Sequence, residues 1–145
     1  MFSYEARISS GDRDEVMQTV ILAGRAADRG DWVGCRNCFT EEVFLDHDSG
    51  GHLPSNRRMD DVIDEWRTLF QSYSQSLHLI CSFEIEIQAG EAECSSLVQS
   101  LHIDTSGQIL QSFGSYRDAL IFNGGTWKIS RRIYREVARL PMQSI

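Results

Sequence analysis

The chain has 145 residues, a length typical of one domain, of which 41% are hydrophobic and 24% charged. Its net charge of −7 at pH 7 argues against nucleic acid or an anionic membrane surface as a partner, because both require a clustered basic face. The sequence contains neither a basic segment followed by an apolar run nor the roughly 20 apolar residues of a membrane span. We therefore expect a single cytoplasmic domain over residues 1–145.

Three helices are expected in the first half of the chain. The first begins at Asp12-x-x-Glu15, which has the form of a capping box, and its apolar residues recur at helical spacing up to Gly30. Asp31 can cap a short second helix, and Asp60 can cap a third with the cleanest helical period in the chain. The apolar positions of these two helices are Trp32, Cys35, Phe39, Val62, Ile63, Trp66, Leu69, Phe70 and Tyr73.

Strands dominate the rest of the sequence. A short strand at residues 43–48 is followed by a Gly50-Gly51 turn and an irregular stretch through Pro54. Alternating apolar and polar residues then predict long strands at 77–87, 91–103, 108–122 and 126–137. One face of the first long strand would carry Leu77, Leu79, Cys81, Phe83, Ile85 and Ile87. Helices followed by a meander of strands predict the α+β class.

Four segments, in order along the chain, resemble the SnoaL-like domain family. They are residues Ala26 to Trp32, Phe39-Thr40, Gly114 to Asp118 and Trp127 to Arg132. The resemblance covers roughly residues 12–137 and implies the fold of the nuclear transport factor 2-like superfamily. That fold is a strongly curved, mostly antiparallel sheet that forms a cone with three N-terminal helices. Members include dehydratases of the scytalone and bile-acid types, a dehydrochlorinase, cyclases, isomerases and non-catalytic modules, so fold alone does not define function.

Asp28 is the first candidate site residue. It lies four residues after Gly24 and seven after Ile21, so at about 100° per residue it projects from the apolar stripe of the first helix. A carboxylate there needs a partner, because burial and the negative end of the helix dipole both disfavour its charge. In the dehydratases and the dehydrochlorinase, an acid at this position holds a histidine at the position of His78. The resemblance implies an Asp28–His78 pair with His78 as general base, whereas each residue taken singly is more often structural than catalytic.

Two further candidates lie on later strands. His102 stands where scytalone dehydratase-like enzymes place a second pocket histidine, and an exposed histidine beside the Asp104 turn is the alternative. Tyr116 and Asp118 project to the same side of one strand. Tyr116 can reach the pocket or simply pack, and Asp118 is expected to pair with Arg132 as part of the scaffold.

Arg132 matches an arginine common in the family and would stabilise a developing enolate oxygen. Strand alternation instead places Arg131 on the face of Trp127, unless a bulge shifts the register. That face would carry Trp127, Ile129, Arg131, Ile133 and Val137. We keep Arg132 as the candidate, with Arg131 as its alternative.

No cofactor and no metal are expected. The sequence has no Gly-rich phosphate loop and no dinucleotide fingerprint. One cluster has residue types that bind metals, and we interpret it as a solvated polar loop: Asp46, His47, Asp48 and His52. The four cysteines are interpreted as reduced, buried small hydrophobes: Cys35, Cys38, Cys81 and Cys94.

The sequence thus predicts a cofactor-independent lyase or isomerase, of the dehydratase or cyclase kind, acting on a small cyclic, largely apolar molecule. Its catalytic residues would be Asp28, His78, His102, Arg132 and Tyr116. The alternative is a non-catalytic ligand-binding module, or a structural protein like the small subunits of ring-hydroxylating dioxygenases. Ala23 stands where the bile-acid dehydratases have a tyrosine, which weakens any transfer of their substrate. A homodimer or homotrimer is expected, because the outward strand faces are not consistently polar.

Overall fold

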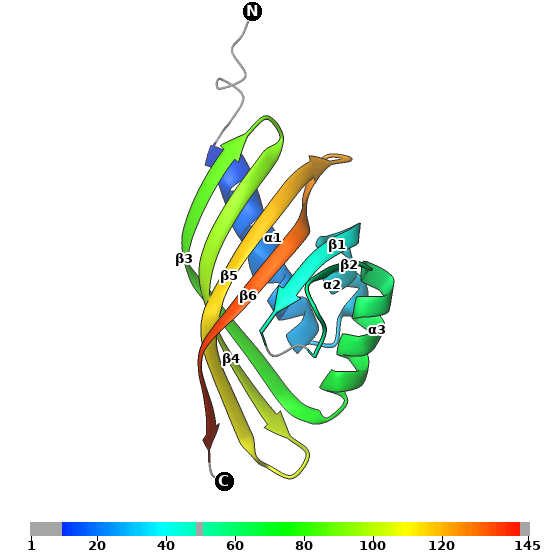
Figure 1. The fold of residues 1–145 in the computed structure, drawn as a ribbon, viewed down its shortest axis with the longest axis vertical. Helices are drawn as coiled ribbons and strands as arrows, with labels where there is room; N and C mark the ends of the chain where they lie inside the picture. Colours follow the sequence, from blue (N-terminus) through cyan, green and yellow to red (C-terminus); the bar gives the residue numbers. More distant parts are fainter. Residues whose placement is uncertain (1–9, 49–50, 143–145) are drawn as a thin grey trace, which may run out of the picture.

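The computed structural model describes residues 10–48 and 51–142. Within these ranges the helices are α1 (Ser10–Asp28), α2 (Trp32–Asn37) and α3 (Met59–Phe70). The strands are β1 (Phe39–His47), β2 (Ser55–Arg58), β3 (Tyr73–Gln88), β4 (Glu91–Asp104), β5 (Ile109–Asn123) and β6 (Thr126–Met142). Figure 1 shows the four long strands β3 to β6 curving past α1, with the other elements gathered beside them.

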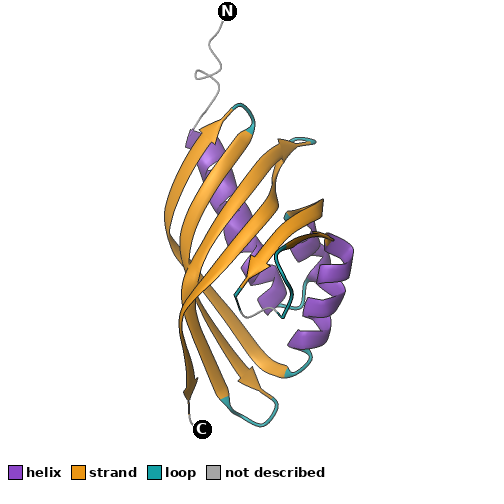
Figure 2. Ribbon diagram, in the orientation of Figure 1, coloured by secondary structure: helices purple, strands orange, loops and turns teal. Residues whose placement is uncertain are grey.

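The strands form one sheet in the order β2-β1-β6-β5-β4-β3. All neighbours are antiparallel except β1 and β6, which run parallel. The sheet is curved but not closed, and its helices lie on one side of it (Figure 2). The predicted α+β class with a mostly antiparallel, curved sheet and N-terminal helices is confirmed. Among the described helices, none combines the length and the apolar character needed to cross a membrane.

The helix boundaries follow the sequence signals only in part. Asp31 caps α2 as predicted, because its Oδ1 accepts a hydrogen bond from the Gly34 amide at 2.9 Å. Asp60 does not cap α3, since the helix begins at Met59 and Asp60 lies in its first turn. The stretch predicted to be irregular through Pro54 contains neither helix nor strand from residue 51 on, and β2, which was not predicted, follows it. The predicted Gly50-Gly51 turn lies partly outside the described residues. Phe39, assigned to the second helix, begins β1 instead.

A bulge in β3 divides that strand into two halves with opposite orientations. Ser82 has a left-handed backbone with a φ of 57°, and the register against β4 shifts just after Cys81. Leu77 and Leu79 are therefore 49% and 52% exposed, whereas Ile85, beyond the bulge, is 8% exposed. The predicted single apolar face from residue 77 to residue 87 is wrong, because the extra residue reverses which side of the sheet each side chain faces.

A second bulge, in β6, decides between the two arginine candidates. Adjacent residues of β5 pair with Ile129 and Arg131, so Ser130 is the extra residue. The shift turns Arg132 to the buried side, where it is 7% exposed, and sends Arg131 to the outer face, where it pairs with Glu93 at 2.8 Å. The alternative that placed Arg131 in the pocket is therefore wrong. The residues of the predicted buried face that the shift turns outward are Arg131, Ile133 and Val137.

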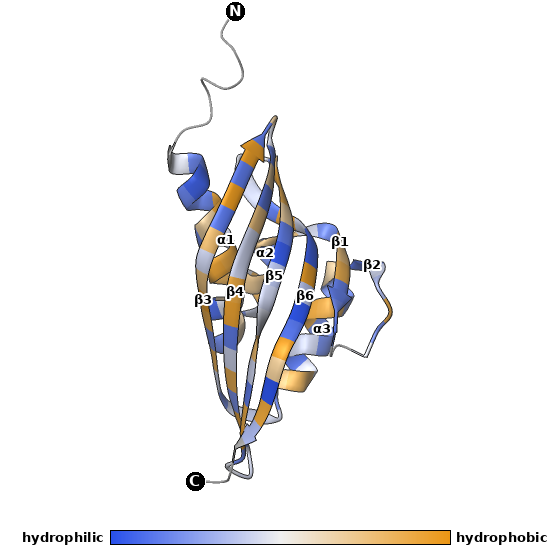
Figure 3. Cartoon of the chain, turned by 60° about the vertical axis from the view of Figure 1, so that its left-hand side comes forward, coloured by the Kyte–Doolittle hydropathy of each residue, from blue (hydrophilic) through white to orange (hydrophobic). Residues whose placement is uncertain are grey.

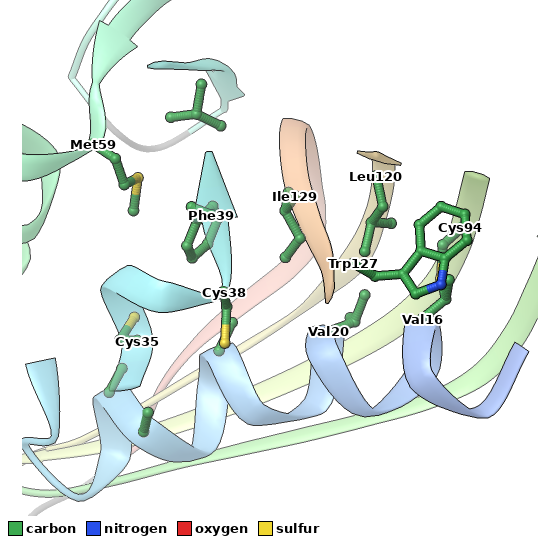
Figure 4. Close-up of a cluster of buried hydrophobic side chains, with 14 of the residues drawn as sticks. Val16, Val20, Cys35, Cys38, Phe39, Met59, Cys94, Leu120, Trp127 and Ile129 are labelled. Atoms are coloured by element: carbon green, nitrogen blue, oxygen red, sulfur yellow. The ribbon is translucent and has the colours of Figure 1, made fainter. Parts of the chain in front are cut away.

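The apolar core fills one end of the space between the helices and the sheet. Figure 4 shows Val16 and Val20 of α1 facing Leu120 and Trp127 of the sheet, all four being buried. Three of the four cysteines lie in this core as predicted, and burial raises the pKa values of Cys35 and Cys94 to about 12 and of Cys38 to about 11. Cys81 is exposed, contrary to the prediction, because it precedes the β3 bulge and shares the outer face of the sheet with Leu77 and Leu79.

Candidate functional site

A cavity of about 530 Å³ lies between the sheet and the helices, at the end that the core leaves open. Its apolar lining comes mainly from β1 and α3: Phe39, Leu45, Trp66, Leu69 and Phe70. Its polar lining comes mainly from the inner face of the sheet: His78, Ser100, His102, Ser112, Tyr116, Arg132 and Tyr134. A flat ligand in this space would meet carbon on one side and hydrogen-bonding groups on the other.

Asp28 and His78 are in direct contact at one wall of this cavity. Oδ1 of Asp28 lies 2.6 Å from Nδ1 of His78, and Oδ2 accepts the His78 backbone N–H at 2.7 Å. The side chains are only 10% and 13% exposed. An ionised carboxylate can only accept, so Nδ1 carries the hydrogen and the lone pair of the ring is on Nε2. The contact therefore sets the tautomer that a general base requires.

Gly24 allows this contact to form. A Cβ atom at Gly24 would lie 3.1 Å from the Cβ of His78 and 3.2 Å from Cδ1 of Ile80, closer than most such contacts. The missing side chain lets α1 approach β3 closely, and Asp28 follows one helical turn later on the same face. Sequence analysis used Gly24 only to define the apolar stripe and missed this role in packing.

His102 lies beside His78, with ring centroids 5.6 Å apart. Its Nδ1 lies 2.8 Å from the hydroxyl of Ser76, and its ring stacks on Tyr73 at 4.3 Å. Burial, followed by the nearby positive charge of His78, lowers the pKa of His102 to about 4. His102 is therefore a neutral imidazole at neutral pH, and the structure places it in the cavity lining rather than at an exposed edge.

Arg132 and Asp118 form a closed ion pair in the cavity floor. Nε and Nη2 of Arg132 donate to the two oxygens of Asp118 at 2.8 and 2.9 Å, and Asp118 has no exposed surface. The Tyr116 ring lies against the guanidinium, 3.9 Å from Cζ. Burial alone would lower the pKa of Arg132, but the charge and hydrogen bonds of Asp118 raise it above its ordinary value. Burial raises the pKa of Tyr116, so its phenol stays neutral.

The cavity carries no unpaired cation among its described lining residues. Arg57 donates to Glu65 at 3.0 Å, and Arg139 donates to Glu136 at 3.0 Å. Together with the pairing of Arg132, these contacts leave the three arginines of the lining charge-compensated. Such a pocket offers little attraction to an anionic ligand.

The cluster with metal-binding residue types is dispersed into other contacts. Asp46 and Asp48 accept hydrogen bonds from Arg135 at 2.6 and 3.4 Å, and Nε2 of His52 lies 3.1 Å from Glu65. His47 belongs to β1, lines the cavity and stacks on Tyr134 with centroids 4.4 Å apart. In residues 10–48 and 51–142, no group of three or more potential ligands is arranged to hold a metal ion.

Sequence analysis missed Glu65 of α3 and three polar cavity residues of the sheet: Ser100, Ser112 and Tyr134. Strand parity contained the signal for the serines. Ser100 precedes His102 by two residues, and Ser112 precedes Tyr116 by four, so each shares its face with a residue already singled out. Tyr134 was hidden by the bulge at Ser130, which changes the parity after it.

The chain belongs to the SnoaL-like domain family, because the model of that family matches residues 9–133, most of the sequence. The fold is that of the nuclear transport factor 2-like proteins, and the neighbours among solved structures include dehydratase-like and dehydrochlorinase proteins. No curated protein matches the chain closely enough to count as a relative.

Three solved structures illustrate the likeness. The protein Kfla4162 of Kribbella flavida superposes with a TM-score of 0.85 at 18% identity, over 90% of this chain and 93% of that one. A scytalone dehydratase candidate of Novosphingobium aromaticivorans gives 0.81 at 15% identity, over 93% and 90%. Hexachlorocyclohexane dehydrochlorinase LinA-type3 of Novosphingobium barchaimii gives 0.77 at 13% identity, over 93% and 92%. At these identities the likeness shows the fold alone.

Proposed function

We propose that this protein is a cofactor-independent lyase or isomerase that removes a proton from a carbon atom of a small, cyclic, uncharged molecule. The observation that carries the proposal is the contact of Asp28 with Nδ1 of His78 at the wall of a cavity. A largely buried imidazole whose tautomer is fixed by a carboxylate, with its second nitrogen unused by that carboxylate, is suited to general base catalysis.

In the proposed reaction, Nε2 of His78 accepts the proton and Asp28 stabilises the resulting imidazolium. The electron pair of the C–H bond then has two possible fates. In elimination it forms a carbon–carbon double bond as an adjacent hydroxyl leaves, and that hydroxyl takes the proton back from His78 as water. In isomerisation it forms an enolate, which accepts the same proton at a different carbon. Neither course requires an oxidant, a reductant or another co-reactant.

The substrate class follows from the lining of the cavity. A volume of about 530 Å³ accommodates a molecule of a few fused rings, and the aromatic side chains of β1 and α3 favour a largely apolar ring system. The pairing of all three lining arginines with carboxylates favours a ligand without net charge.

The remaining candidates receive auxiliary roles in this proposal. Arg132 uses Nε and Nη2 on Asp118, and its Nη1 makes no hydrogen bond to the residues that the structure describes. That nitrogen and the phenol of Tyr116 are positioned to stabilise a developing oxyanion. His102, which is neutral, would hydrogen-bond a hydroxyl or carbonyl group of the ligand.

The experiment is deuterium exchange in D2O, followed by NMR, at the carbon beside the carbonyl of cyclic ketones with one to three rings. The wild-type protein should accelerate exchange of at least one ketone above the buffer rate. His78→Ala should return the rate to that of the buffer, and added imidazole should restore part of it. Exchange at the buffer rate for every ketone, or an unchanged rate in His78→Ala, would contradict the proposal and favour a non-catalytic ligand-binding module.

We also propose that the single domain assembles as a homodimer or homotrimer through the outer face of the sheet. Figure 3 shows this side of the sheet, which the helices leave uncovered, with hydrophobic and hydrophilic residues following one another along the strands. Leu77, Leu79 and Leu97 are each about half exposed there. The four free cysteines agree with the reducing cytoplasm as the proposed location.

A further inference from the structure

Two serines form a hydrogen-bonded pair in the cavity floor. The hydroxyl oxygens of Ser100 and Ser112 lie 2.5 Å apart, and the residues are 8% and 9% exposed. Both line the cavity that contains His78. Neither serine has a role in the proton abstraction proposed above.

The register of the sheet places this pair in one row with His78. Ser100 is the direct partner of His78 across β3 and β4, and Ser112 is the direct partner of Ser100 across β4 and β5. Residues paired in this way have Cα atoms about 4.5–5.5 Å apart. A ligand atom that meets Nε2 of His78 therefore has its next neighbours within reach of the Ser100 hydroxyl.

Hydrogen-bond accounting shows what the pair can offer. Two hydroxyls carry two hydrogens, and the bond between them uses only one. Whichever serine donates in that bond, the hydrogen of the other hydroxyl is left for an oxygen in the cavity, which both serines line.

We propose that Ser100 and Ser112 form a binding subsite for a carbonyl or hydroxyl oxygen of the ligand. The subsite holds the carbon beside that oxygen against His78, and so selects oxygen-bearing rings over the corresponding hydrocarbons. The inference rests on the proposed function in one respect, that the ligand occupies the His78 cavity. It assigns the serines to recognition, and its test is a binding measurement that needs no turnover.

Ser96 provides a matched comparison within the same strand. It is 3% exposed and lies on the same face of β4, four residues before Ser100, but it is not part of the cavity lining. Its hydroxyl has no hydrogen-bond partner among the described residues. A serine at this face is thus compatible with the fold without a partner, so the bonded pair is not a requirement of the sheet.

The experiment measures dissociation constants by isothermal titration calorimetry for two ketone and hydrocarbon pairs, beta-tetralone with tetralin and fluorenone with fluorene. The wild-type protein should bind a ketone more tightly than its hydrocarbon. Ser100→Ala and Ser112→Ala should each weaken ketone binding about tenfold, the usual effect of losing one hydrogen bond, and leave hydrocarbon binding unchanged. Ser96→Ala should change neither constant.

The outcomes separate this inference from the proposed function. If His78→Ala abolishes deuterium exchange but keeps the preference for the ketone, both proposals stand. If the preference survives Ser100→Ala and Ser112→Ala, or the wild-type protein shows no preference in either pair, the subsite is refuted while the exchange assay decides the function independently. A melting temperature within the error of wild type for each variant excludes misfolding as the cause.

Discussion

Two acid–base pairs each place their basic side chain in the lining of the same cavity, and they differ in which of its nitrogen atoms stay unbonded. Asp118 and Arg132 join through two hydrogen bonds, and the carboxylate has no exposed surface. Asp28 binds His78 through one ring nitrogen and uses its other oxygen on the backbone. The guanidinium has only donors, whereas the imidazole keeps a second nitrogen, Nε2, that can accept a proton. The first pair is suited to holding β5 and β6 together, and the second to proton transfer.

The largest expected effect is a loss of stability when the Asp118–Arg132 ion pair is broken. Asp118→Ala leaves the guanidinium of Arg132 buried without a countercharge, which should lower the free energy of unfolding by about 3–5 kcal/mol in urea denaturation. Glu93→Ala, which removes the exposed partner of Arg131, is the matched control and should cost no more than about 1 kcal/mol. Similar losses in the two variants would mean that Arg132 relaxes into the cavity.

Disrupting the Asp28–His78 pair should affect activity more than stability. Asp28→Asn keeps the shape of the side chain but removes its charge, so the exchange rate should fall about a hundredfold or more. Asp64→Asn, which makes the same change at an exposed position of α3, is the control and should catalyse deuterium exchange at the wild-type rate. A wild-type rate in Asp28→Asn would show that the carboxylate serves packing only.

A smaller effect is expected from closing the gap between α1 and β3. The methyl group in Gly24→Ala would lie 3.1 Å from the Cβ of His78, so the ring must move by a few tenths of an ångström. We expect the exchange rate to fall several-fold, while better helix propensity of about 1 kcal/mol offsets part of the packing cost. Unchanged ring chemical shifts of His78 in the NMR spectrum would show that the helix moves instead.

The last expected effect concerns His102 and the pH dependence of stability. Its pKa is about 4 in the folded protein against 6.5 for the free side chain, so the unfolded chain binds the proton more readily. The contribution of His102 to stability is complete above pH 6.5 and is lost as the pH falls towards 4. His102→Gln should therefore lose less stability than wild type between pH 7 and pH 4. NMR titration of His102 in His78→Ala should show its pKa rising towards the ordinary value, because a neighbouring positive charge is gone.

The parts of the molecule that obey a regular period could be predicted from the sequence. Helical spacing put Asp28 on the apolar face of the first helix, and the family resemblance supplied His78 as its partner; their contact is observed, and their catalytic role stays a prediction. The α+β class followed from the change of period after residue 76. The family resemblance added the curvature of the sheet.

The failures occur where one residue breaks the period. Ser82 and Ser130 are the extra residues of two bulges, and neither is a glycine or proline that would mark the position in the sequence. The bulge at Ser82 explains why Cys81 is exposed, and the bulge at Ser130 decides whether Arg131 or Arg132 faces the cavity. The role of Gly24 was hidden for a different reason, because a close approach depends on the position of β3, which is distant along the chain.

The bulge at Ser130 accommodates one extra residue of β6 without disturbing the strand that follows. Ile129 and Arg131 already pair with adjacent residues of β5, so a one-residue deletion of Ser130 would join them as regular neighbours and leave Arg132 and Tyr134 facing the cavity. Regular pairing of Ser130 would have the opposite effect, because simple alternation would then turn Arg131 inward and Arg132 outward. One unpaired residue thus decides which of two neighbouring arginines becomes part of the interior.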